Sequence, residues 1–170
     1  MNFHKITTND IANGKGVRVV LWVSGCNHKC KECHNPQTWD INSGIPFTEN
    51  DYITLYKALD KPYIDGITFS GGDPLHPNNR ETVYNISTQL KKDLPNKTQW
   101  LYTGYSWEDI YNLPIMNNID VLVDGEFKID LKDITLLFKG SSNQRLIDVQ
   151  ATIKNNNKII LWQDKNICFK

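Results

Sequence analysis

The sequence has no excess of charge of either sign and no long apolar run. Nineteen basic and nineteen acidic residues give a formal net charge of zero, and no polybasic stretch is present that could neutralise a phosphate backbone. Nucleic acid is therefore a poor candidate partner. Because no apolar run approaches the roughly 18 residues that span a bilayer, and no secretory segment is visible, we expect a cytoplasmic protein with no membrane contact.

Cysteine is also scarce: the chain of 170 residues has four. Cys26, Cys30 and Cys33 form one run with the spacing Cys-x3-Cys-x2-Cys, and Cys168 stands alone near the C-terminus. The second cysteine pair of the common zinc sites is missing. A disulfide framework is not expected, because Cys26 follows a strand-like apolar run and an unexported chain keeps its thiols reduced.

Three closely spaced thiolates are one short of closing a cluster of four irons. The fourth iron would keep an open position where a ligand can bind and react, whereas closed four-cysteine sites usually carry electrons or hold structure. Two alternatives stay open on the spacing alone. One is a zinc site completed by His28 or His34, and the other is a set of reduced structural thiols.

Composition fits one globular domain over residues 1–170, with 39% apolar and 22% charged residues. Runs of β-branched and other apolar residues predict strands at 17–23, 66–70, 99–102, 119–123 and 158–162. Capping residues and apolar spacing predict a helix capped at Thr48 that runs to about Leu59, one from Asn78 or Asn79 through Leu90, and a short one from Ser106. Residues 136–153 fit either element.

Strands that alternate with helices favour a parallel sheet with right-handed crossovers. The polar and glycine-rich residues follow the strands, at the end where loops of a parallel sheet assemble a site. We therefore expect four segments to converge: 26–33, 71–73, 103–105 and 124–126. A full barrel takes about 200 residues or more, so this chain has room for about five or six units. We predict an α/β fold, an open partial (β/α) barrel with a mostly parallel sheet.

At these residues the chain resembles a known superfamily. The cysteine spacing after the first strand, with Gly71-Gly72-Asp73-Pro74 after the second, resembles the radical S-adenosylmethionine enzymes. Thr38-Trp39, Asp124-Gly125 and Ser142-Asn143-Gln144-Arg145, together with the short length, are similar to the subgroup that activates anaerobic ribonucleoside-triphosphate reductase. The likeness extends from Ile11 to about Val149, which is most of the chain.

The resemblance implies a mechanism. Cys26, Cys30 and Cys33 would ligate three irons of a [4Fe-4S] cluster, and S-adenosylmethionine would chelate the fourth. An electron from a flavodoxin- or thiol-type donor would pass through the cluster, cleave the sulfonium bond and give a 5′-deoxyadenosyl radical. That radical would remove hydrogen from a backbone glycine in the large glycyl-radical subunit of anaerobic ribonucleotide reductase. The cofactor supplies the chemistry, and the protein supplies position and water exclusion.

The same resemblance assigns further residues to cofactor binding. Glycines let the backbone approach a ligand, and a carboxylate beside an ammonium is a charge-assisted contact, so residues 71–73 would hold the methionine amino end. Glu32 stands where many members carry an aromatic residue against the adenine, and His34 could supply that ring instead. Arg145 fits either a surface charge or a cofactor contact, and Arg18 either a solvated strand-edge charge or a site residue. The expected set is His34, Gly71, Gly72, Asp73, Thr103, Asp124 and Arg145.

Three other functions compete with this interpretation. An activator of the pyruvate formate-lyase type is typically longer, and this chain lacks room for the extra barrel units. An electron carrier would want a fourth cysteine close to the first three, and the sequence has none there. A zinc-stapled binding module does not need a scaffold of alternating strands and helices.

Replacing Cys26, Cys30 or Cys33 by Ala should abolish the iron–sulfur absorption of anaerobically purified protein, because two thiolates do not hold the cluster against solvent. Cys168→Ala is the matched control and should keep the cluster, since that thiol is distant in sequence. Metal analysis with the ultraviolet-visible spectrum separates iron–sulfur from zinc. A Cys168→Ala protein that lacked its cluster would point instead to a closed four-cysteine site.

Overall fold

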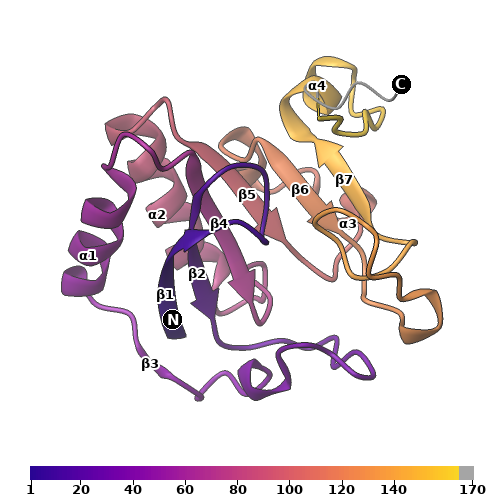
Figure 1. The fold of residues 1–170 in the computed structure, drawn as a ribbon, viewed down its shortest axis with the longest axis horizontal. Coiled ribbons are helices and arrows are strands. Elements are labelled where there is room, and N and C mark those ends of the chain that lie inside the picture. Colours follow the sequence, from indigo (N-terminus) through magenta and orange to yellow (C-terminus); the bar gives the residue numbers. More distant parts are fainter. Residues whose placement is uncertain (165–170) are drawn as a thin grey trace.

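The computed structural model describes residues 1–164, and Cys168 lies outside the described residues. A seven-stranded sheet has the order β3-β1-β2-β4-β5-β6-β7 (Figure 1). Its strands are β1 (Asn2–Asp10), β2 (Arg18–Val23), β3 (Ile45–Pro46), β4 (Gly66–Gly71), β5 (Thr98–Tyr102), β6 (Val121–Asp124) and β7 (Arg145–Asp148). The helices are α1 (Glu49–Leu59), α2 (Arg80–Asp93), α3 (Trp107–Ile110) and α4 (Val149–Lys154), with 3-10 turns η1 (Pro36–Thr38), η2 (Pro114–Asn117) and η3 (Ile129–Leu131).

The centre of the sheet is parallel. Strands β2, β4, β5 and β6 run in one direction, and α1, α2 and α3 lie in the connections between successive strands of this set (Figure 1). Antiparallel β1 and β7 flank these four strands, and β3 adds to β1. The predicted α/β fold with an open, largely parallel sheet is confirmed. The parallel part holds four strands, and antiparallel strands supply both edges.

Strand β1 has no counterpart among the predicted strands. Its sequence is mostly polar, and within it only Phe3 is buried, so no apolar run indicates a strand there. It pairs with β2 through a hairpin whose loop contains Gly14 and Gly16, both with positive φ. Because that conformation favours glycine, the two glycines are explained as parts of the bend.

The capping signals locate the first two helices. The Asp51 carboxylate accepts a hydrogen bond from the backbone N–H of Thr48 at 2.8 Å, and α1 begins at the next residue, as a capping box requires. Helix α2 begins directly after Asn79 and ends two residues before Pro95. No helix within residues 1–164 is long and apolar enough to cross a membrane.

The C-terminal part differs from the expectation. The strand predicted at 158–162 is wrong, because only Leu161 pairs, in an isolated bridge with Ile147. Leu161 is 56% exposed, so this apolar run is not enclosed between two layers as the central strands are. The undecided stretch 136–153 contains both β7 and α4. Asp148 separates them, since its side chain caps α4 by accepting a hydrogen bond from the Ala151 N–H at 2.9 Å.

The central strands are buried on both faces. Leu101 packs in an apolar core that also contains Leu55 of α1 and Leu90 of α2. Its neighbour Trp100 points to the opposite face, where it packs in a second, smaller apolar group with Phe138. The helices therefore cover one face of the sheet, and the other face carries a separate aromatic layer.

Arg18 is neither solvated nor at the site. Its side chain is fully buried at the amino end of β2, with the guanidinium 5.3 Å from the Trp100 ring. Burial lowers its pKa to about 10, yet every N–H has an acceptor. These acceptors are Oγ1 of Thr68 and Thr98 and the main-chain carbonyls of Lys15, Ile67 and Thr98.

Replacing Arg18 by Met should lower the free energy of unfolding by several kcal/mol, because each buried acceptor left without a donor costs about 1–3 kcal/mol. The measurement is urea unfolding followed by circular dichroism. Lys5→Met is the matched control, since Lys5 is an exposed cation whose ammonium lies 5.4 Å from the Trp22 ring. Equal urea midpoints for the two variants would contradict a structural role for Arg18.

Candidate functional site

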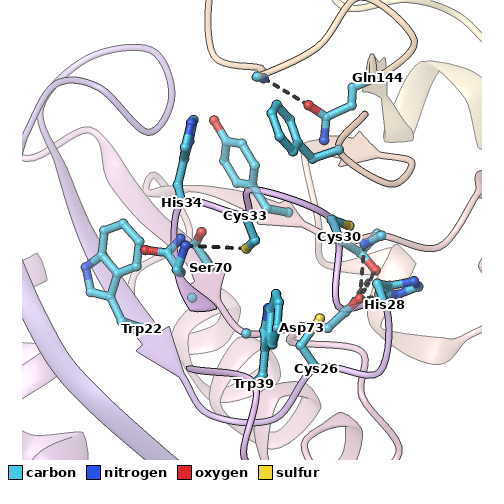
Figure 2. A pocket seen from close by; sticks show the side chains of 18 of the residues that line it. Trp22, Cys26, His28, Cys30, Cys33, His34, Trp39, Ser70, Asp73 and Gln144 are labelled. Carbon is cyan, nitrogen blue, oxygen red and sulfur yellow. Dashed lines mark hydrogen bonds and ion pairs between the residues drawn. The ribbon is translucent and has the colours of Figure 1, made fainter. Parts of the chain in front are cut away.

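The candidate site is a cavity of about 280 Å³ at the carboxyl ends of the parallel strands. The segments that follow β2, β4, β5 and β6 all contribute to its walls, so the predicted convergence of these four segments is confirmed. Asn13, from the loop between β1 and β2, also lines it. Figure 2 shows Cys26, Cys30 and Cys33 around this cavity, with Asp73 and His28 on one side and Gln144 on another. We call it the site cavity.

The cysteine loop, residues 24–35, leaves β2 and turns sharply. Gly25 has a φ of 97°, and its N–H donates to the Thr38 carbonyl at 2.7 Å. The Cys26 N–H donates to the Trp39 carbonyl at 3.1 Å. The Thr-Trp pair singled out in the sequence thus supports the backbone from which the first thiol projects.

The three thiols are half-buried and form no disulfide. Burial raises the pKa of the Cys26 and Cys30 thiols, so neither favours the thiolate without a positive partner. Bound iron supplies such a charge and deprotonates coordinating thiols. The arrangement therefore suits metal ligation better than it suits a free nucleophilic thiolate.

Asp73 is the most connected side chain at the site, and it is 1% exposed. Its carboxylate accepts hydrogen bonds from the Thr103 hydroxyl at 2.9 Å, the Gly104 N–H at 3.0 Å and the Leu75 N–H at 2.8 Å. His28 Nε2 lies 2.9 Å from the same carboxylate. Both carboxylate oxygens therefore have protein partners, and Asp73 joins the loop after β4 to the cysteine loop and to the loop after β5.

His28 extends this connection to a further loop. Its Nδ1 lies 3.0 Å from a carboxylate oxygen of Glu126, and its ring packs edge-on against Tyr105 at 4.7 Å. The hydrogen bond to Asp73, followed by that to Glu126, raises the pKa of His28. A Cβ on Gly104 would lie 2.4 Å from the imidazole, so glycine at 104 makes room for this ring.

Gly71, the last residue of β4, and Gly72, which follows it, let the backbone approach a neighbouring segment closely, and that segment is part of the protein itself. A Cβ on Gly72 would lie 2.5 Å from the Gly25 carbonyl oxygen. The Asp73 N–H donates to that same carbonyl at 2.7 Å. Gly71 has a φ of 106°, and a Cβ there would lie 2.7 Å from the Val23 backbone. These glycines let the β4 loop pack directly on the start of the cysteine loop.

Of the other expected residues, His34 and Thr103 line the site cavity and Asp124 and Arg145 do not. The Asp124 carboxylate is buried and accepts hydrogen bonds from Arg145 and from the Trp107 N–H at 2.8 Å. Arg145 also pairs with Glu108 at 2.8 Å, and the bond to Asp124 raises the pKa of Arg145. A buried carboxylate needs such a partner, so this pair joins β6, β7 and α3 behind the wall.

Some lining residues have no counterpart in the expected set. Trp22, Ser70 and Tyr102 line the site cavity from the strands themselves. Side chains alternate between the faces of a strand, so these residues project from the face that α1 and α2 leave uncovered. An aromatic residue near the carboxyl end of a buried strand is the sequence signal that could have identified Trp22 and Tyr102.

The donor set fits an iron–sulfur cluster better than a zinc ion. Both ring nitrogens of His28 are engaged by Asp73 and Glu126, so this histidine is not free to complete a zinc site. Across residues 1–164, no three or more His, Cys, Asp or Glu side chains gather closely enough to hold one metal ion. A four-iron cluster is larger than one ion, so ligands spread around a cavity suit it.

Replacing Gly72 by Ala should lower stability by about 1–3 kcal/mol and reduce iron content together, because the new Cβ forces the β4 loop away from Gly25. Urea unfolding and iron per chain after anaerobic reconstitution measure the two effects. Lys31→Ala changes an exposed side chain of the cysteine loop and should alter neither. Normal iron content in a destabilised Gly72→Ala protein would show that cluster assembly does not depend on the contact between the two loops.

Known proteins share these features. The family described as "4Fe-4S single cluster domain" matches residues 12–147, and it confirms the expected [4Fe-4S] cluster. An anaerobic ribonucleoside-triphosphate reductase-activating protein of Enterobacteria phage T4 is 45% identical over 146 residues, 86% of this chain and 93% of that protein. One of Escherichia coli (strain K12) is 42% identical over 148 residues, 85% of this chain and 96% of that protein. The chain therefore belongs to the 4Fe-4S single cluster domain family, together with the activating proteins of anaerobic ribonucleoside-triphosphate reductase.

Proposed function

We propose that this protein activates anaerobic ribonucleoside-triphosphate reductase, by using a [4Fe-4S] cluster and S-adenosylmethionine to form a glycyl radical on the large subunit. The observation that carries the proposal is the loop with Cys26, Cys30 and Cys33 on the wall of the site cavity. The relatives that bear this activity in their names match almost their whole length, which supports the same reaction here.

In this proposal Cys26, Cys30 and Cys33 ligate three irons. The site cavity has no fourth cysteine on its wall within the described chain, so one iron stays open for S-adenosylmethionine. When bound, the cluster and S-adenosylmethionine supply reductive cleavage of a sulfonium bond and, through it, removal of a hydrogen atom. The protein itself orients these groups and excludes water from them.

In this proposal the loop after β4 forms part of the wall against the cofactor, and the loop after β5 holds that wall in place. The backbone at Gly71 and Gly72 lines the site cavity and gives the methionine end a wall without side chains. Asp73 and Thr103 hold this wall in place through their mutual hydrogen bonds of 2.9 Å. We expect Asp73 to act on the cofactor chiefly through the loops that it joins.

The adenine has an aromatic wall available. His34 and Phe127 line the site cavity, with ring centroids 5.4 Å apart and planes tilted by 40°. Glu32, where many relatives of the superfamily carry an aromatic residue, is exposed and absent from the wall. His34 with Phe127 therefore replaces the missing ring. Asp124 and Arg145 contribute by fixing the strands behind the wall.

The partners follow from the reaction. A glycine in the large glycyl-radical subunit is the substrate, and a flavodoxin- or thiol-type reductant supplies the electron. Both belong in the reducing cytoplasm, which is the compartment that we propose for this protein, because thiols and iron–sulfur clusters persist there.

The test is anaerobic incubation of the reconstituted protein with S-adenosylmethionine, a reductant and the large reductase subunit. Electron paramagnetic resonance should detect a glycyl radical on the reductase, and methionine should accumulate. The matched control is Cys33→Ala, which should give neither product. Rapid consumption of S-adenosylmethionine with a small nucleotide, and no radical on the reductase, would contradict the proposal.

A further inference from the structure

One wall of the site cavity continues into an exposed apolar surface. The rim segment, residues 127–144, connects β6 to β7 and appears in orange near the cysteine loop in Figure 1. Phe127, Gly140 and Gln144, near its two ends, line the site cavity. Between them lies the tip, residues 133–138, most of which are exposed. The segment therefore reaches from the cavity wall to the protein surface.

The rim segment is a formed hairpin. Lys132 and Ser141 pair in an antiparallel bridge, and the Ser142 N–H donates to the Leu131 carbonyl at 2.9 Å. Gln144 closes the base, because its Oε1 accepts the Gly140 N–H at 2.9 Å. This backbone does not have to be ordered when a partner binds.

The tip is fixed to the sheet from its inner side. The Phe138 ring packs on Trp100 with centroids 5.3 Å apart, and the Tyr102 hydroxyl donates to the Phe138 carbonyl at 2.8 Å. At the start of the tip the Thr135 N–H donates to the Asp133 side chain at 2.8 Å. The Phe138 side chain thus packs on the sheet, and this contact holds the tip against the protein.

The same hairpin carries three exposed apolar side chains. Ile134 is 90% exposed, Leu137 57% and Leu131 42%. Single exposed apolar residues are ordinary on a protein surface, whereas exposed apolar residues that gather in one region mark an interaction site, and these three lie within seven residues of one hairpin. A preorganised apolar surface binds with a smaller entropy loss than a mobile one.

We propose that Leu131, Ile134 and Leu137 form a docking surface for the large subunit of the anaerobic reductase. This inference rests on the proposed function, in which the substrate is a backbone glycine of a protein. A polypeptide that brings a glycine to the site cavity must pass its rim, and the rim segment is continuous with the cavity wall. Because the rim segment borders the cavity that this glycine must reach, we assign the reductase as the occupant.

The experiment compares two variants. The first combines Ile134→Asp with Leu137→Asp, and the second, the control, carries Ile11→Asp alone. Ile11 is 74% exposed, follows β1 beside the amino end of β2, and is not among the residues that line the site cavity. Each full-length protein is reconstituted with its cluster and titrated with the large reductase subunit. The glycyl radical yield gives the reductase concentration for half-maximal activation. Methionine release under dithionite without reductase gives the reaction that needs no docking.

The double variant should raise the half-maximal reductase concentration at least tenfold and leave the uncoupled methionine release unchanged. Ile11→Asp should change neither. The conservative variant Ile134→Leu, with Leu137 intact, should activate the reductase normally. An unchanged half-maximal concentration, an equal effect of Ile11→Asp, or loss of the uncoupled reaction would overturn the docking surface. In the first two cases the wild-type protein still forms the radical, so the proposed function stands. Wild-type protein that forms no radical at any reductase concentration would overturn both.

Discussion

The site depends on one buried carboxylate. A charge that is removed from water is costly unless it has partners, and the Asp73 carboxylate is 1% exposed. Its partners come from three different segments: His28 in the cysteine loop, Leu75 beyond β4, and Thr103 with Gly104 after β5. Satisfying this single charge therefore fixes the relative positions of the loops that hold the thiols and form the cavity wall. The bond from His28 to Glu126 adds the loop after β6.

A second buried charge stabilises the other end of the same sheet. Arg18, at the amino end of β2, is fully buried and donates to β4 and to Thr98 of β5. The two charged groups are not paired with each other. The Asp73 carboxylate accepts hydrogen bonds from its own neighbours, and the Arg18 guanidinium donates hydrogen bonds to its own. Strands β2, β4 and β5 pair in one unbroken register, with Arg18 bonded at its amino end and Asp73 at its carboxyl end. The cysteine loop begins from a strand held at both ends.

The face of the sheet that α1 and α2 leave uncovered gives the cavity its remaining walls. Trp22 and Tyr102 line the cavity, and farther along this face Trp100 packs against Phe138 of the rim segment. The aromatic layer thus joins the rim segment to the strands, and Tyr102 takes part in both structures because its hydroxyl donates to Phe138. Cavity and rim are parts of one packed unit, so a protein docked on the proposed rim surface would lie next to the site cavity.

The sequence by itself determined the local features. The cysteine spacing, the apolar runs of β2, β4, β5 and β6, and the cap at Thr48 each depend on neighbouring residues, so short patterns identify them. The tertiary structure decided what each polar side chain contacts. Asp73 meets Thr103, thirty residues away in the chain, Asp124 meets Arg145, and polar β1 becomes a strand only because β2 offers it an edge. These pairings are set by strand register and by the need to satisfy buried charge, neither of which is visible in a local window of sequence.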